Sequence, residues 1–287
     1  MRFISGLYIG IFGLVVVLLG GWYFTLAITF LTYFALLELF RMAEFTGIKP
    51  ATKTTLISCA AIIISTYLEL KGILAQDISS SILPISSVVI CTWLLFQPKS
   101  GKISDIATSI FGLFYLGFLP SYWIRLRELT IIPDNFYLNN WDFSNLESLS
   151  GLSITLITCL LIVSSDIGSY FIGKKYGRRS LSAISPGKTK EGLFGGIVCS
   201  ILTGILFSGI FNFGRPLIMG LVFGTIVSLM ALVGDLIESM MKRDANLKDS
   251  GNLLPGHGGM LDRIDSYIFI PSLIYYLIVI FNYLGFI

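Results

Sequence analysis

Long stretches without a charged side chain constrain this chain more than any other feature. Between Arg2 and Arg41 the only charged residue is Glu38. Seven further uncharged runs, of 15 to 23 residues each, lie between residues 53 and 69, 77 and 99, 105 and 125, 147 and 166, 191 and 215, 215 and 235, and after 265. A transmembrane helix needs about 20 predominantly apolar residues. Because only 13% of the 287 residues are charged, about half the share in soluble domains, we expect lipid to surround most of the protein.

The form of these runs predicts the fold class. Backbone groups in lipid must be hydrogen-bonded internally, so each run must be a helix or a strand of a closed barrel. The runs are continuously apolar, which excludes barrel strands, because those alternate apolar and polar residues. The first run is long enough for two helices, with a turn at Gly20-Gly21. The sequence therefore predicts an all-α polytopic integral membrane protein with about nine transmembrane helices.

The distribution of basic residues predicts the orientation. If the loops are assigned alternately to the two sides, 16 of the 20 Lys and Arg residues lie on the side of the N-terminus. Cytoplasmic loops carry an excess of Lys and Arg, so we expect a cytoplasmic N-terminus and a C-terminus on the other side. Both large basic loops, 174–190 and 242–263, then face the cytoplasm. Attraction to anionic lipid is an alternative reason for the basic residues of the first loop.

The segment 166–190 contains the first candidate site residues. Asp166 lies before its apolar run has ended, where a carboxylate costs about 2.5–3.5 kcal/mol unless it faces protein or water. It is therefore a functional candidate, with helix packing as the alternative. Further on, a Pro-Gly turn carries Lys188 and Lys190 just before a predicted helix. The N–H groups of a helix start, together with two lysines, can hold a phosphate.

The segment 234–243 places charges on one face of a predicted helix. Asp235, Glu238, Ser239 and Lys242 have the spacing i, i+3, i+4 and i+7, which brings them to one face. Carboxylates on that face could hold a divalent ion. Lys242 and the adjacent Arg243 could neutralise a phosphate beside it.

A polar, glycine-rich loop and a second acidic pair follow. The loop carries Lys248 and the sequence PGHGG, in which His257 is the only histidine of the chain. Glycines allow a close approach of the backbone to a ligand, so we expect His257 to bind a ligand or shape the site, with a structural role as the alternative. Asp262 and Asp265, with Arg263 between them, open the last predicted helix. They could stabilise its N-terminus or, with Asp235, hold Mg²⁺.

These motifs together resemble the phosphatidate cytidylyltransferase (CDP-diacylglycerol synthase) family. The resemblance covers residues 166 to 266, and the signature from Ser239 to Asp265 keeps the family spacing without a gap. Its residues are Asp166-x-Gly168-x-Tyr170, Ser185-Pro186-Gly187-Lys188-Thr189, Ser239-x-x-Lys242-Arg243, Lys248-Asp249-Ser250, Pro255-Gly256-His257-Gly258-Gly259 and Asp262-Arg263-x-Asp265. Residues 1–150 match only as a hydrophobic multi-helix pattern. We therefore divide the chain into 1–150, with about five transmembrane helices and a non-cytoplasmic loop, and a catalytic transmembrane region, 151–287.

The resemblance implies an enzyme of phospholipid biosynthesis. It implies that CTP and phosphatidate give CDP-diacylglycerol and pyrophosphate, with Mg²⁺ as cofactor and K⁺ as a candidate second ion. It also implies a homodimer. We expect a bacterial-type inner (cytoplasmic) membrane, with the active face in the cytoplasm as the basic loops indicate, and no nucleic-acid partner. The expected metal residues are Asp235, Asp262, Asp265 and Asp166. The expected catalytic residues are Asp235, Asp262, Asp265, Lys242 and Arg243. The expected phosphate- or substrate-binding residues are Lys188, Lys190, Lys248, His257, Arg263 and Ser239.

Two alternatives stay open from the sequence. One is a related lipid nucleotidyltransferase or kinase with another acceptor, such as an isoprenoid-ether lipid or a polyprenol. The other is a transporter with intramembrane carboxylates on its ion path. Transporters often contain internal repeats with paired broken helices, and the sequence contains no such repeat.

Overall fold

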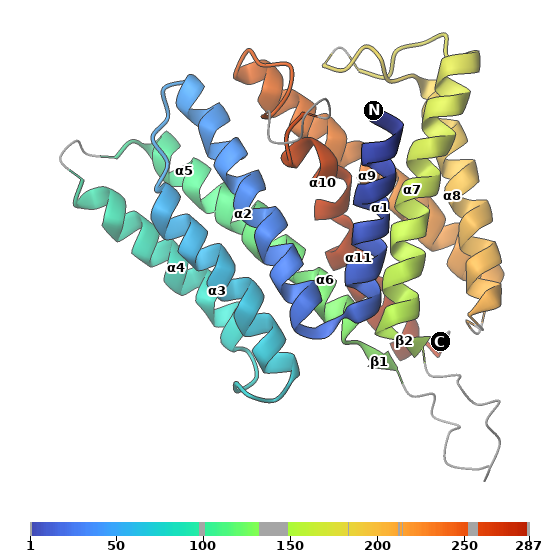
Figure 1. Cartoon of the computed structure of the whole chain (residues 1–287), viewed down its shortest axis with the longest axis horizontal. Helices are drawn as coiled ribbons and strands as arrows, with labels where there is room; N and C mark the ends of the chain where they lie inside the picture. The colour runs from blue at the N-terminus through green and yellow to red at the C-terminus, as the bar shows by residue number, and fades with distance from the viewer. Residues whose placement is uncertain are drawn as a thin grey trace. The chain divides into compact units, whose positions relative to one another are not determined.

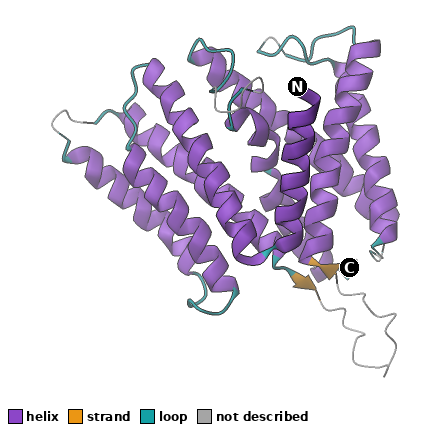
Figure 2. Cartoon of the chain, viewed as in Figure 1, coloured by secondary structure: helices purple, strands orange, loops and turns teal. Residues whose placement is uncertain are grey.

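A computed structural model describes residues 2–97, 101–131, 149–182, 184–211, 213, 215–251 and 258–285. Helices make up nearly all of the described chain (Figure 2). The elements are α1 (Arg2–Leu19), α2 (Gly21–Phe45), α3 (Thr52–Leu70), α4 (Ile78–Leu95), α5 (Ile103–Gly112), the π-helix η1 (Leu113–Phe118), α6 (Leu119–Arg127), β1 (Thr130–Ile131), β2 (Leu149–Ser150), α7 (Gly151–Tyr176), α8 (Lys190–Ile210), α9 (Pro216–Asp244), α10 (Leu261–Ile268) and α11 (Ile270–Tyr283).

The helices confirm the predicted fold class. Within the described residues, eight helical segments are long and apolar enough to cross a membrane, and Gly10–Leu19 is a shorter apolar helix. The 15-residue run after Lys53, the shortest in the sequence, lies inside α3. The predicted turn at Gly20-Gly21 separates α1 from α2, and both glycines have positive φ angles of 63° and 52°. The two short strands pair in antiparallel fashion.

The chain forms two compact units, which are interleaved in sequence. Unit 1 contains Met1–Arg125 and Ile237–Ile268, and unit 2 contains Leu126–Leu236 and Phe269–Ile287. These units are defined by packing, so the division into an N-terminal and a catalytic region near residue 150 stays a prediction.

Unit 1 packs its helices around α2 and α3. α3 contacts α2, α4 and η1, and α2 also contacts α10 (Figure 1). Glycines allow these contacts to be close: a Cβ atom on Gly112 would lie 2.7 Å from the ring of Phe40, and one on Gly117 would lie 2.9 Å from Cys59 Sγ. The contact of α2 with α10 joins segments that are more than 200 residues apart in the sequence, and it carries part of the candidate site.

Unit 2 is held together by small residues. α7 packs along α8, where a Cβ atom on Gly168 would lie 2.7 Å from Cys199. α8 packs on α9 in the same way, because a Cβ atom on Gly204 would lie 2.9 Å from the Cα of Gly220. Ser165 donates a hydrogen bond to Ser228 across the α7–α9 contact, at 2.7 Å. In lipid, where helices gain little from the hydrophobic effect, close packing of small residues and interhelical hydrogen bonds drive association.

Candidate functional site

Helix α9 carries the first group of candidate residues. Asp235, Glu238, Ser239 and Lys242 all lie on this continuous helix of 29 residues, as the spacing predicted. Asp235 belongs to unit 2 and the other three belong to unit 1. Because the helix is unbroken between them, the relation of Asp235 to Glu238 is set by the helix itself, and their carboxylate oxygens come within 4.8 Å.

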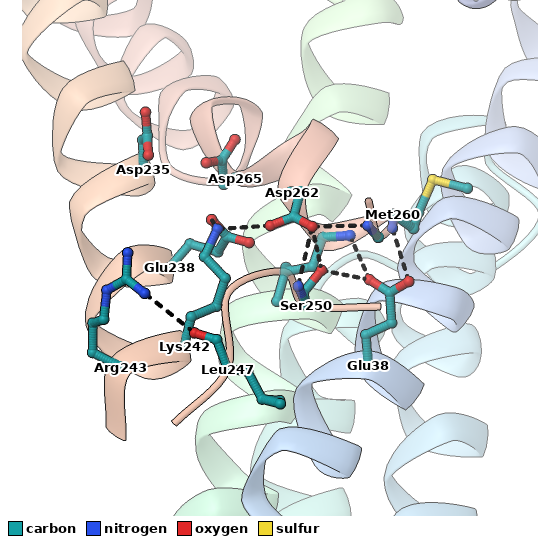
Figure 3. A network of polar contacts seen from close by, with 12 residues as sticks. Glu38, Asp235, Glu238, Lys242, Arg243, Leu247, Ser250, Met260, Asp262 and Asp265 are labelled. Atoms are coloured by element: carbon teal, nitrogen blue, oxygen red, sulfur yellow. Dashed lines mark hydrogen bonds and ion pairs between the residues drawn. The ribbon is translucent and has the colours of Figure 1, made fainter. Parts of the chain in front are cut away.

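Lys242 lies between two carboxylates of unit 1. Its Nζ is 2.6 Å from Glu238 Oε2 and 2.7 Å from Asp262 Oδ1, and only 14% of its side chain is exposed (Figure 3). Charge-assisted hydrogen bonds of this kind are short and strong. A buried charge needs such partners to offset the loss of hydration. The three residues therefore form a fixed cluster of paired charges at the end of α9 and the start of α10. We call this cluster of Glu238, Lys242 and Asp262 the acid–base group.

Asp262 is held by the segment that precedes it. Its Oδ2 accepts hydrogen bonds from the N–H of Ser250 at 3.1 Å, from the N–H of Gly259 at 2.8 Å, and lies 3.0 Å from the Ser250 hydroxyl. Gly258 has a φ of 80°, and a Cβ atom there would lie 2.7 Å from Asp262 Oδ2. The two glycines thus let the chain wrap around this carboxylate. Both oxygens of Asp262 face hydrogen-bond donors, and its expected metal role stays a prediction.

Glu238 and Asp265 form a second acidic pair in unit 1. Both side chains are buried, and their carboxylate oxygens lie within 4.8 Å of each other. Within the described part of the chain, Glu238 Oε1 is buried and has no hydrogen-bond partner. A buried oxygen without a donor is rare in native structures. Oxygen atoms of carboxylates are the ligands that Mg²⁺ accepts, so the donor set fits a hard divalent cation.

In unit 2, the basic loop between α7 and α8 brings Lys188 to α9. Lys188 Nζ forms an ion pair with Asp235 Oδ2. The loop backbone is fixed on both sides of Lys188: its carbonyl accepts from the N–H of Leu181 at 2.7 Å, and Lys190 donates its N–H to Arg179 at 3.0 Å. The Pro-Gly turn therefore precedes a helix, as predicted, and α8 begins at Lys190.

Two local caps complete this loop. Thr189 is the N-cap of α8 and accepts a hydrogen bond from the N–H of Gly192 at 3.1 Å. Glu191 accepts from the N–H of Arg178 at 3.1 Å.

Asp166, on α7, is near enough to both Asp235 and Lys188 for electrostatic interaction. Three of the predicted residues from distant segments thus come together within unit 2.

The remaining candidate residues differ in exposure. Ser239 is buried, whereas the basic residues Lys190, Arg243, Lys248 and Arg263 are exposed. Arg243 donates to the carbonyl of Leu247 at 3.4 Å, at the end of α9. His257 lies outside the described residues.

Sequence reasoning missed Glu38, which is buried on α2. Its carboxylate accepts hydrogen bonds from the N–H groups of Met260 and Leu261, both at 2.8 Å. A signal was present, because Glu38 is the single charge within the first apolar run. The reasoning that made Asp166 a candidate applies equally to it. The sequence analysis included Glu238 in the charged face of α9, but it assigned only aspartates as metal ligands.

Comparison with known proteins supports the resemblance over a wider range than the motifs. The model of the cytidylyltransferase family matches residues 1–281. The chain is 42% identical to a phosphatidate cytidylyltransferase of Synechocystis sp., over 92% of this chain and 90% of that one. It is 36% identical to phosphatidate cytidylyltransferase 4, chloroplastic, of Arabidopsis thaliana (96% and 72%), and 31% identical to the phosphatidate cytidylyltransferase of Bacillus subtilis (98% of both chains). The similarity confirms the resemblance drawn from residues 166–266 and extends it to the N-terminal helices.

Proposed function

Because the chain belongs to the cytidylyltransferase family, we propose that it transfers a cytidylyl group from CTP to phosphatidate, giving CDP-diacylglycerol and pyrophosphate. The observation that carries this proposal is the acid–base group of Glu238, Lys242 and Asp262 in unit 1. Lys242 and Asp262 belong to the signature motifs, Glu238 directly precedes the first of them, and the exposed basic residues Arg243 and Arg263 are their neighbours in the chain. Such a group can orient phosphates next to a cation.

The chemistry requires charge neutralisation more than a strong base. An oxygen of the lipid phosphate attacks the α-phosphorus of CTP, and the bond from that phosphorus to the bridging oxygen of pyrophosphate breaks. The attacking oxygen is already anionic, so the protein needs to bring two polyanions together and stabilise the leaving pyrophosphate. We assign phosphate binding to the basic residues Lys188, Lys190, Lys242, Arg243, Lys248 and Arg263, with Ser239 and His257 as further substrate-binding candidates.

Mg²⁺ is the proposed cofactor, with K⁺ as a candidate second ion. The buried pair Glu238 and Asp265 supports this choice, since Glu238 has an oxygen without a hydrogen-bond donor among the described residues. Asp235, one turn earlier on α9, would supply a third carboxylate, and Asp262 and Asp166 stay candidates beside them. When bound, Mg²⁺ would neutralise the phosphates and orient them for in-line displacement. In this arrangement Asp262 keeps Lys242 directed at the acidic group.

The chain is an integral membrane protein, and we further propose that its active face is cytoplasmic. The excess of basic residues in the loops 174–190 and 242–263 supports this orientation. The lipid substrate would then enter from the bilayer and CTP from the cytoplasm. A bacterial-type inner membrane and a homodimer complete the proposal.

Purified protein in lipid nanodiscs tests the function directly. With CTP, phosphatidate and Mg²⁺, we expect CDP-diacylglycerol and pyrophosphate in equal amounts. Offering an ether-linked phosphatidate and a polyprenol in parallel separates the alternatives. Phosphorylation of a polyprenol without cytidylyl transfer would contradict the proposal, as would movement of a substrate across a liposome membrane without turnover of CTP.

A further inference from the structure

Glu38 is a buried carboxylate inside a membrane-spanning helix. It lies on α2, its residue is 8% exposed, and it is the only charged residue between Arg2 and Arg41. Within the described residues, no basic side chain lies at ion-pair distance from it. A carboxylate in such a place is costly unless donors surround it. The hydrogen-bond partners of Glu38 therefore indicate its role.

Among the described residues, the donors to the Glu38 carboxylate all come from the segment that leads into α10 and from its first residue. Met260 donates its N–H to Oε1, and Leu261 donates its N–H to Oε2, both at 2.8 Å. These N–H groups stand at the start of α10, where a helix has no internal acceptors for its first donors. The favoured interaction of a negative charge with a helix N-terminus adds to the effect. Glu38 thus caps α10 from a different helix.

Ser250 connects Glu38 to Asp262. Its Oγ lies 3.0 Å from Glu38 Oε2 and 3.0 Å from Asp262 Oδ2 (Figure 3). A hydroxyl has one proton to donate, so the two carboxylates share it. Asp262 in turn accepts from Lys242, which also contacts Glu238. A continuous series of polar contacts therefore runs from α2 to the acid–base group of α9.

Two glycines make this close approach possible. A Cβ atom on Gly251 would lie 2.5 Å from Glu38 Oε1, and one on Gly259 would collide with both Glu38 Oε2 and the Ser250 hydroxyl. Gly251 and Gly259 therefore pack directly against the carboxylate of Glu38. Any larger side chain at these two positions would displace that carboxylate. The contacts of Glu38 with Ser250, Met260 and Leu261 fix the position of the first turn of α10.

We propose that Glu38 is a positioning residue for cytidylyl transfer: it holds Ser250 and the start of α10 so that Asp262 faces Lys242. The proposal rests on the proposed function for its kinetic consequence. Glu38 does not touch the reactants. It acts through Asp262 and Lys242, and a misplacement of about 1 Å in such groups can cost about 10²-fold in rate.

The main test compares Glu38→Gln with Asp105→Asn. Asp105 is also buried in unit 1 and also accepts two backbone N–H groups, from Lys49 and Lys102, both at 2.8 Å. It therefore serves as a matched control outside the segment 237–268. For Glu38→Gln we expect kcat to fall by about 10²-fold with less than a threefold change in KM for CTP. For Asp105→Asn we expect a lower melting temperature but an unchanged kcat of the folded protein.

A measurement without turnover separates this proposal from the function. Hydrogen–deuterium exchange of the backbone amides of residues 259–262 should become at least tenfold faster in Glu38→Gln and stay unchanged in Asp105→Asn. If the wild-type protein transferred no cytidylyl group, the proposed function would be wrong while the exchange result would still decide the positioning role. Normal kcat and normal exchange in Glu38→Gln would overturn the positioning role alone.

A second variant serves if Glu38→Gln does not fold. Ser250→Ala removes the shared hydroxyl and leaves both backbone hydrogen bonds of Glu38 in place. We expect kcat to fall by about tenfold, the lower end for one hydrogen bond to a charged group. In a foldable double variant the two losses should combine to less than their product, because both act through Asp262. Wild-type kcat in Ser250→Ala would reject the connection from Glu38 to Asp262.

Discussion

The acid–base group of unit 1 and the ion pair of Lys188 with Asp235 in unit 2 differ in how firmly their side chains are held. In unit 1, Asp262 has four hydrogen-bond donors within reach and Lys242 is 14% exposed. In unit 2, Lys188 and Asp235 form one ion pair with side chains 24% and 36% exposed. Partly exposed ion pairs contribute little to stability, and buried ones with many donors are costly to break. The first group is suited to fixed positions in the site, and the second can exchange its partner for a substrate phosphate.

The largest effect is expected from removing the charge of either aspartate. Asp262→Asn and Asp235→Asn should each lower cytidylyl transfer by about 10³-fold, the scale of losing a main electrostatic contact in an active site. The comparison predicts different stabilities, however. Asp262→Asn should lower the melting temperature, because an amide cannot accept from all its donors. Asp235→Asn should leave the melting temperature within about 1 °C, since it loses only a partly exposed pair.

Calorimetry or a thermal-shift assay in detergent, together with release of pyrophosphate, measures both quantities. Equal destabilisation by the two variants would contradict the contrast between the units. Rates near those of the wild type at saturating Mg²⁺ would remove Asp235 and Asp262 from the proposed metal site.

A methyl group added to the loop of unit 1 should have the next largest effect. In Gly259→Ala the Cβ atom would collide with Ser250 and Glu38, so we expect kcat to fall by about 10²-fold as the start of α10 shifts. Gly209→Ala, in α8 of unit 2, is the matched control, since a Cβ atom there meets nothing within 4 Å. If the two variants had the same kcat, the tight packing around Glu38 would be irrelevant to the reaction.

Replacing Lys188 should have a moderate effect on binding. Lys188→Met keeps the length of the side chain but removes its charge, and we expect KM for one phosphate substrate to rise by about tenfold, equivalent to about 1.4 kcal/mol. The melting temperature should not change, because the pair with Asp235 is partly exposed. Steady-state kinetics at varied CTP and varied phosphatidate identifies the substrate concerned. Lys188→Arg retains a cation and should keep KM within threefold; a loss equal to that of Lys188→Met would point to a role other than charge.

The smallest effect is expected at Lys71, which follows α3 and is exposed. It lies in a loop that the orientation predicted from the sequence places on the side opposite the active face. Lys71→Ala should leave both kcat and KM within twofold in the same assay. A larger change in either constant would question that orientation.

Much of the fold could be predicted from the sequence because a backbone that crosses lipid must form helices or a closed barrel. Within the described residues, every predicted apolar run is helical, including the short run inside α3, although the run between residues 105 and 125 covers α5, η1 and α6 and the last run is divided between α10 and α11. Helix periodicity also placed Asp235, Glu238 and Lys242 on one face of α9. Local patterns of this kind depend on neighbours within a few residues, and the sequence contains that information directly.

The contacts of Glu38 could not be predicted in this way. Its partners lie 212, 222 and 223 residues further along the chain, and no periodicity links α2 to α10. The hydrogen bonds to Asp262 depend on the backbone course around Gly258 and Gly259, which spacing does not determine. The π-helix η1 also has no marker in the sequence. Long-range polar contacts require the packed structure, and here they determine how the site is held.

The late partners of Glu38 have a consequence for biosynthesis. Ribosomes make α2 long before Ser250, Met260 and Leu261 exist, so this carboxylate must enter the bilayer without its donors. Insertion of an unpaired acidic residue costs about 2.5–3.5 kcal/mol, and that cost persists until the C-terminal segment arrives. Completion of the enzyme is therefore one of the last events of its assembly. A chain that terminates before residue 250 lacks all of the described hydrogen-bond donors to the Glu38 carboxylate.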